Sequence, residues 1–151
     1  MATITPTLTL TSNASSATTP GPLSIALSLS ATDSLTVDRV AANILTLSTD
    51  HVLLFDGSAL AALDADNGTA GLHGMFIYMK NVTGSDLDIY IGVVDDGGLT
   101  GEINAADAPN RLFTLKDGEF AFFPFDYTRD ITVDAEGAAK LEYFTFNRAN
   151  S

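Results

Sequence analysis

The chain has 151 residues, 46% of them hydrophobic, which is enough for one domain with a core of its own. It carries 19 acidic and 7 basic residues, a formal net charge of −12, and the basic residues are scattered singly. Phosphate backbones and anionic membranes are bound by clusters of Lys and Arg, so we expect neither nucleic acid nor a membrane as a partner. The absence of cysteine excludes disulfides, thiolate metal ligands and thiol catalysis.

The first residues show no basic segment leading into an apolar core, and no apolar run approaches the about 20 residues that span a bilayer. We therefore expect a chain that is made and kept in solution. Asn-x-Ser/Thr triplets occur at Asn13, Asn67 and Asn81. Without a secretory route, we interpret all three as ordinary loop and turn residues.

Residues 3–11 alternate threonines with the apolar residues Ile4, Leu8 and Leu10. This period of two predicts a half-buried strand, and Pro6 favours an edge strand or an extended arm. A loop of small polar residues, 12–22, follows. We expect residues 1–22 to form the arm or edge strand with its loop and residues 23–151 to form the main domain, within one globular domain overall. The three apolar side chains of the arm are the candidates for contacts with another subunit.

Residues 23–30 resume the alternation, and shorter strands are expected at 34–37, 44–48 and 52–55. Residues 40–42 fit a helical turn as well as a strand. The best helix candidate is Gly57–Leu63, with about two turns.

The second half of the chain holds all of the aromatic residues except Phe55, so it should supply most of the core. Aromatic and β-branched residues predict strands there, with a long loop at 95–110 and a tight hairpin-type turn at Lys116–Glu119. The strands are expected at residues 75–81, 87–94, 111–115, 119–125, 131–133 and 140–146. Many short strands separated by turns predict an all-β fold, an antiparallel β-sandwich with jelly-roll-like topology and one short helix.

Side chains that could perform catalysis or bind a metal are few. His51 and His73 are the only histidines, and they lack the spacing of a zinc site. Asp56-Gly57-Ser58 differs from the aspartic-protease order, and no second carboxylate motif accompanies it. The acidic turns at 64–68 and 95–98 lack the closing glutamate of a calcium loop. We therefore expect no enzyme activity, no catalytic residue, no metal and no cofactor.

The order of the later strands resembles small virion structural proteins of tailed bacteriophages. The similarity is carried by a hydrophobic strand ending in Lys80-Asn81, a strand with Ile91-Gly92, a turn Leu115-Lys116-Asp117-Gly118-Glu119-Phe120 into an aromatic strand, and a final strand with Leu141-Glu142-Tyr143. The resemblance implies a jelly-roll sandwich that oligomerises, often as a trimer, and it supplies no catalytic residue.

On this resemblance we expect a decoration (cement) protein that binds the major capsid protein on the outer surface of a phage capsid and stabilises the shell. Its location would be the host cytoplasm during assembly and then the capsid exterior of the virion. Ile4, Leu8 and Leu10 would contact a subunit or the capsid. The alternative is a receptor- or carbohydrate-binding module of a phage tail or fibre, with Tyr78, Tyr90 and Tyr127 stacking on sugars. Residues 120–125 place aromatics on both faces of one strand, which predicts contact with the core on one side and with a neighbouring subunit on the other.

Overall fold

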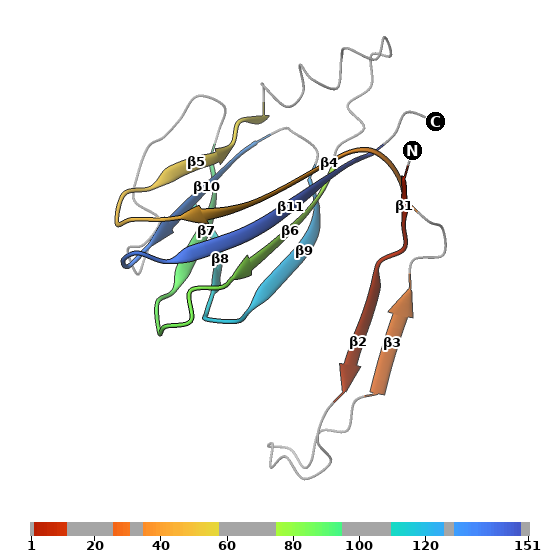
Figure 1. Ribbon diagram of the computed structural model, residues 1–151, viewed down its shortest axis with the longest axis horizontal. Helices are drawn as coiled ribbons and strands as arrows, with labels where there is room; N and C mark the ends of the chain where they lie inside the picture. The colour runs from red at the N-terminus through yellow and green to blue at the C-terminus, as the bar shows by residue number, and fades with distance from the viewer. Residues whose placement is uncertain are drawn as a thin grey trace. The chain divides into compact units, whose positions relative to one another are not determined.

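A computed structural model describes residues 2–11, 26–30, 35–57, 75–94, 110–125 and 129–148. These residues form strands in two compact units, Met1–Val37 and Asp38–Ser151, which divide within one long strand (Figure 1). The strands are β1 (Ala2–Ile4), β2 (Thr7–Thr11), β3 (Ala26–Ser30), β4 (Leu35–Thr46), β5 (Val52–Phe55), β6 (Met75–Asn81), β7 (Ile89–Val94), β8 (Arg111–Leu115), β9 (Phe120–Phe125), β10 (Asp130–Ala135) and β11 (Lys140–Arg148).

The N-terminal unit contains two antiparallel pairs. β1 pairs with the first residues of β4, and β2 pairs with β3 in a sheet of two strands. The alternating stretch 3–11 is divided between β1 and β2 at Thr5 and Pro6, because proline has no N–H to donate to a ladder. The compact unit ends at Val37.

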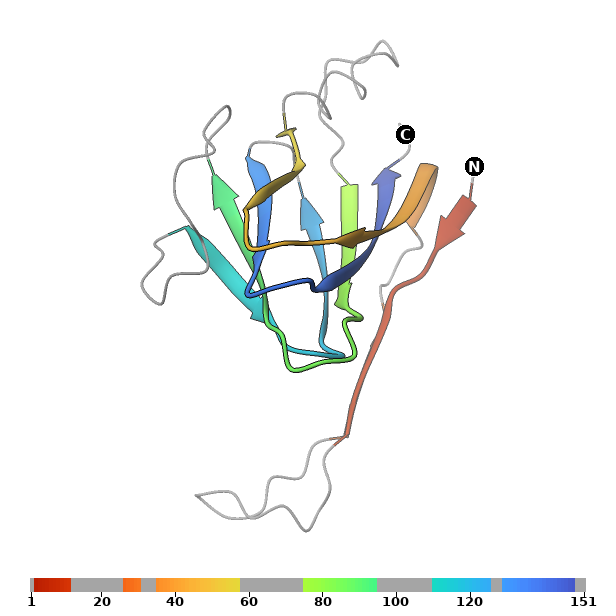
Figure 2. The ribbon, with the colours of Figure 1, turned by 60° about the vertical axis from the view of Figure 1, so that its left-hand side comes forward.

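The second unit is an antiparallel β-sandwich, as the sequence predicts. Within this unit one sheet has the order β4-β11-β6-β9, which β1 of the N-terminal unit extends by pairing with β4, and the other has the order β5-β10-β7-β8 (Figures 1 and 2). The neighbours form nested pairs in chain order: β4 with β11, β5 with β10, β6 with β9, and β7 with β8. This nesting, with alternate pairs assigned to alternate sheets, is the strand order of a jelly roll.

Several predicted elements differ from the structure. The two short strands expected at 34–37 and 44–48 are one strand, β4, and the prediction of a helical turn at 40–42 is wrong. Of the expected helix 57–63, only Gly57 lies among the described residues. The turn at Lys116–Glu119 is confirmed by a 2.9 Å hydrogen bond from the Glu119 N–H to the Lys116 carbonyl, and Gly118 has a φ of 79°. It joins strands of different sheets, so β8 and β9 do not pair as a hairpin would.

The core lies between the two sheets and is made of the inward residues of their alternating strands. Edge-to-face ring pairs span it, Phe55 with Tyr143 at 5.5 Å and Phe113 with Phe123 at 5.8 Å. The fully buried hydrophobic side chains include Met75, Ile77, Met79, Ile89, Ile91, Ile131, Val133 and Leu141. Most of them come from the second half of the chain, as expected from the composition.

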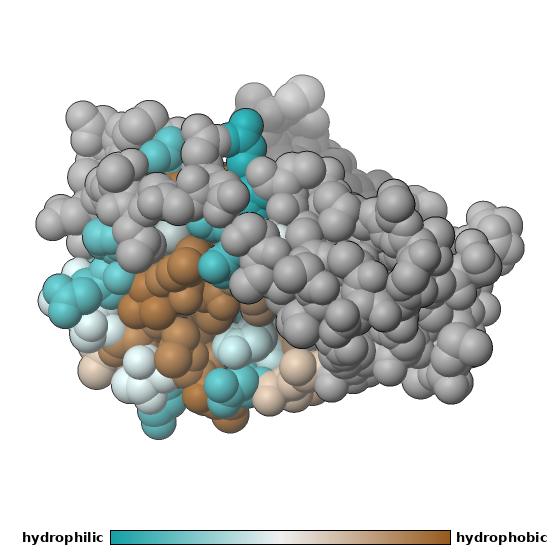
Figure 3. Space-filling model, turned by 90° about the horizontal axis from the view of Figure 1, so that it is seen from above, coloured by the Kyte–Doolittle hydropathy of each residue, from teal (hydrophilic) through white to brown (hydrophobic). Residues whose placement is uncertain are grey.

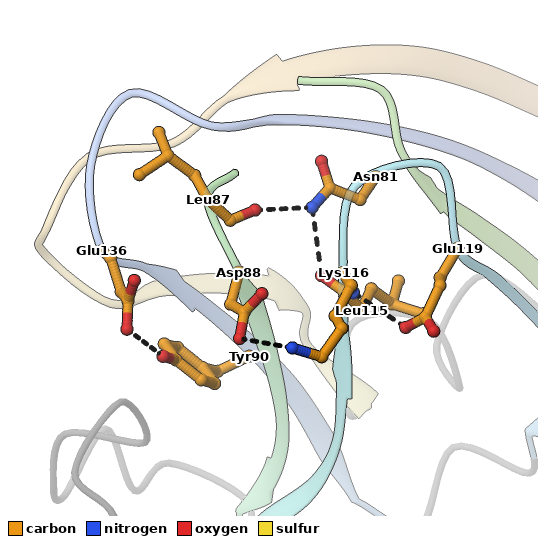
Figure 4. A network of polar contacts seen from close by, with 8 residues as sticks. All are labelled: Asn81, Leu87, Asp88, Tyr90, Leu115, Lys116, Glu119 and Glu136. Carbon is orange, nitrogen blue, oxygen red and sulfur yellow. Dashed lines mark hydrogen bonds and ion pairs between the residues drawn. The ribbon is translucent and has the colours of Figure 1, made fainter. Parts of the chain in front are cut away.

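Asn81, the last residue of β6, joins the two sheets at one end of the sandwich (Figure 4). Its buried side-chain amide donates hydrogen bonds to the Leu87 carbonyl at 2.8 Å and the Leu115 carbonyl at 3.0 Å, which lie next to β7 and at the end of β8. Its carboxamide oxygen accepts from the Thr83 N–H at 3.1 Å. Asn81 is thus a structural residue of the strand end, where a glycan would not fit.

Apolar side chains also reach the surface of the described part of the chain. Figure 3 shows hydrophobic residues gathered in a patch between hydrophilic ones on the side seen from above. The large hydrophobic residues with high exposure are Leu8, Ile44, Leu112, Phe120 and Phe122. Among the described residues, no helix has the length and apolar character needed to cross a membrane.

Candidate functional site

The outer face of the β11-β6-β9 part of the sheet is lined with aromatic rings. β6 and β9 alternate in burial, so that Phe123 and Phe125 pack against the core while Phe120 and Phe122 point outward. Phe120 is 60% exposed and Phe122 is 38% exposed. We call the outward ring residues of these three strands the aromatic face: Phe76, Tyr78, Phe120, Phe122, Phe144 and Phe146.

Strand register brings these six rings into contact with one another. Tyr78 lies directly opposite Phe144 on β11 and Phe122 on β9, so β6 is the central row of the face. Phe76 stacks on Phe122 at 5.4 Å between centroids, and Tyr78 contacts Phe144 at 5.7 Å and Phe120 at 6.1 Å. Because the rings support one another within the sheet, the face is preorganised before any partner binds.

Among the side chains that the structure describes, three charged ones lie in the outward rows of these strands: Lys80 on β6, and Lys140 and Glu142 on β11. Lys80 is directly opposite Glu142. Partial burial raises the pKa of Tyr78 above its ordinary value, and the negative charge of Glu142 raises it further. The Tyr78 hydroxyl is therefore a neutral hydrogen-bonding group within the face at physiological pH.

An open hollow of about 590 Å³ adjoins this face, where β8 and β9 form the edges of their respective sheets. Its lining residues are Phe113, Thr114, Leu115, Gly118, Glu119, Phe120 and Ala121. Among the described residues that line the hollow, Glu119 is the one with a carboxylate.

The three contact candidates predicted from the arm lie on β1 and β2. Ile4 is opposite Leu35 in the β1–β4 pair, and Leu10 is opposite Leu27 in the β2–β3 pair. Leu8 is 44% exposed and is therefore accessible to another subunit. Their role in contacts stays a prediction.

The metal and catalytic candidates of the sequence are only partly described by the structure. His51 precedes β5 and is half-buried. Within the ranges that the structure describes, no group of three or more His, Asp or Glu side chains is positioned to hold a metal ion. His73 and the acidic turns at 64–68 and 95–98 lie outside those ranges.

Tyr90 does not have the exposed ring that sugar stacking requires. It is 6% exposed, its hydroxyl donates a hydrogen bond to Glu136, and the Arg111 guanidinium lies 4.2 Å from the ring centroid (Figure 4 shows the Glu136 bond). The hydrogen bond to Glu136 and burial raise the pKa of Tyr90 to about 12. Interpreting Tyr90 as a sugar-stacking residue is thus wrong, and Tyr127 lies outside the described residues.

The sequence predicts only part of the aromatic face. Residues 120–125 have aromatic side chains on both sides of one strand, and this pattern predicts the outward row of rings on β9. The rows of β6 and β11 show the same alternation, but only the register places them beside β9.

Comparison with known proteins leaves the chain without a family. No family model matches it, and no curated protein matches it. A solved structure titled "Bacillus endospore appendages form a novel family of disulfide-linked pili" matches 82% of this chain and 98% of that chain, at 16% sequence identity and a TM-score of 0.41. That title describes disulfide-linked proteins, whereas this chain contains no cysteine. The similarity is too low to assign a family or a function.

Proposed function

We propose that this chain is a non-enzymatic structural subunit that binds other protein subunits in a larger assembly. The observation that carries this proposal is the aromatic face, which presents six mutually packed rings on the outer side of one sheet. Aromatic residues are enriched in the cores of protein interfaces, and a large contiguous apolar patch marks an interaction site.

The finer form of the proposal is a decoration protein on the outside of a tailed-phage capsid. Its support is the sequence resemblance, the jelly-roll strand order and the net charge of −12, which suits a surface away from the genome. A decoration protein works through multivalent contact: once one site is bound, further contacts form within the complex, and modest interfaces add up to durable attachment. Binding only the assembled shell stabilises the shell by mass action.

The N-terminal strands supply a second means of attachment in this proposal. A sheet of two strands is marginal alone, and β2 and β3 are hydrogen-bonded only to each other in the described part of the chain. Addition of a strand from a neighbouring subunit would complete such a sheet. Leu8→Lys places a charge on its exposed apolar side, and we expect this variant to assemble more weakly while its core melts at an unchanged temperature.

Size-exclusion chromatography with light scattering is the first test of the structural role. We expect the purified chain to form an oligomer and to co-sediment with shells assembled from a tailed-phage major capsid protein. A monomer that ignores such shells but gives clear hits on a glycan array would replace this proposal with the carbohydrate-binding alternative.

A further inference from the structure

The aromatic face differs from the rest of this acidic molecule in its charge. The chain has 19 acidic residues, yet the described outward side chains of β6, β9 and β11 include a single acid, Glu142, beside Lys80 and Lys140. Two copies with a net charge of −12 repel each other wherever their acids meet. The aromatic face is therefore a surface through which two copies can approach with little repulsion.

The charges on this face are also complementary to themselves. Lys80 and Glu142 are opposite each other across β6 and β11, and neither makes an ion pair within the described part of the chain. In a two-fold contact, residue i of one copy meets residue j of the other, and j meets i. A second copy can therefore place its Glu142 against Lys80 and its Lys80 against Glu142.

Partners of other chemistry fit the face less well. A face that binds a basic protein needs several acidic residues, and the described side chains of this face include only one, Glu142. A polyanion needs a cluster of Lys or Arg, and two lysines at one margin do not form one.

We propose that the aromatic face is a homotypic interface, at which two copies of this chain pack their β11-β6-β9 faces together about a two-fold axis. This inference rests on the proposed structural role and names the second subunit. Aromatic rings form the centre of the contact, while Lys80, Lys140 and Glu142 form its margin. We expect this contact to be weak, with a dissociation constant on the order of micromolar.

A fluorescent reporter tests whether the face becomes buried. The chain has no tryptophan, so Phe120→Trp introduces a unique indole on the face of the full-length protein. Leu112→Trp is the matched control, because Leu112 is 56% exposed on β8 of the other sheet. As concentration rises from nanomolar to hundreds of micromolar, we expect a blue shift of the emission at position 120 and none at position 112. No shift at position 120, or equal shifts at both positions, would overturn the inference.

Charge reversal tests the identity of the partner. Lys80→Glu and Glu142→Lys each place like charges across the two-fold axis, and we expect each variant alone to associate about tenfold more weakly. An equimolar mixture of the two should recover association, because one face is now doubly acidic and the other doubly basic. Changes within a single chain cannot produce this recovery in a mixture. Lys116→Glu, on the turn between β8 and β9, is the control and should leave association unchanged.

The results separate this inference from the proposed function. If the chain oligomerises but neither the indole at position 120 nor the charge mixture responds, the two-fold interface is wrong and the structural role stands. If the chain is monomeric at every concentration yet binds capsid shells, the inference again fails alone. A monomer that binds only glycans would remove both.

Discussion

The two sheets of the sandwich differ in what lies on their outer sides. β10, at the centre of the β5-β10-β7-β8 sheet, is buried at every position, and its neighbour β7 is buried at all positions but one. In the other sheet, β6 alternates between buried and half-buried residues, and β9 alternates between half-buried and exposed ones. The two central strands of one sheet, which we call the covered sheet, are thus buried on both faces within a single chain, whereas β6 and β9 of the other, open sheet are buried on one.

The types of residue on the two outer faces only partly match this difference in burial. The covered β10 carries the polar residues Asp130, Thr132 and Asp134 at buried outward positions, whereas the open face of β6, β9 and β11 carries phenylalanines. Solvent contact alone would favour the opposite arrangement, since exposed strand faces are ordinarily polar. The open face therefore has the composition of a surface that is buried in an assembly.

The largest expected effect on stability comes from comparing substitutions on the two faces of one strand. Ile77 and Tyr78 are neighbours on β6, but Ile77 is fully buried between the sheets and Tyr78 points outward. We expect Ile77→Ala to lower the free energy of unfolding by about 2–5 kcal/mol, because it leaves a cavity. Tyr78→Ala should cost roughly 1 kcal/mol in the isolated chain, where its ring contacts are only partly buried. Urea unfolding of both variants below the association range checks this difference, and equal losses would contradict the assignment of the outer face as a binding surface.

The next effect concerns the connection between the sheets. Asn81→Ala leaves the buried carbonyls of Leu87 and Leu115 without their amide donor, which should cost about 2–3 kcal/mol of unfolding free energy. Asn43→Ala is the matched control, because both side-chain hydrogen bonds of Asn43 are exposed to water: its amide donates to the Tyr143 hydroxyl at 3.5 Å, and its oxygen accepts from the Ile44 N–H at 2.8 Å. We expect the control to change stability by less than about 0.5 kcal/mol in the same denaturant series. Similar losses at both positions would show that Asn81 does not hold the sheets together.

The sequence predicts the second half of this fold far better than the first. The limits of β6 and β8 match the predicted strands residue for residue, because alternation and aromatic content agree there. The sequence predicts two short strands where β4 is one, because the small alanine side chains at its centre carry little information about period. The pairing of β4 with β11 joins the two parts into one strand. The aromatic face could not be assembled from the sequence for a similar reason: register, which no local pattern encodes, places Tyr78 between Phe122 and Phe144.

A pH experiment tests the covered sheet. The pKa of Tyr90 is raised from 10.0 to about 12 by its hydrogen bond to Glu136 and by burial, so the folded state favours the neutral phenol. The resulting stabilisation is fully present below about pH 10 and is lost as the pH rises through about 12. Tyr90→Phe should cost about 1.5 kcal/mol near neutral pH, the size of a hydrogen bond to a charged acceptor. We expect the difference from the wild-type chain to shrink between about pH 10 and pH 12 in urea unfolding, and a constant difference would contradict the assigned bond.

The smallest effect concerns the turn that carries the chain from the covered sheet to the open one. Gly118 has a φ of 79°, where a side chain is strained, although nothing lies within 4 Å of an added Cβ. Gly118→Ala should therefore cost about 1 kcal/mol through the backbone alone. Gly137→Ala is its control, because no positive φ applies there and the added Cβ would meet Leu87 at an ordinary 3.5 Å. The control should be neutral or slightly stabilising in thermal unfolding. Since Gly118 precedes Phe120 by two residues, a loss of stability accompanied by weaker self-association would further show that this turn helps to position the edge of the aromatic face.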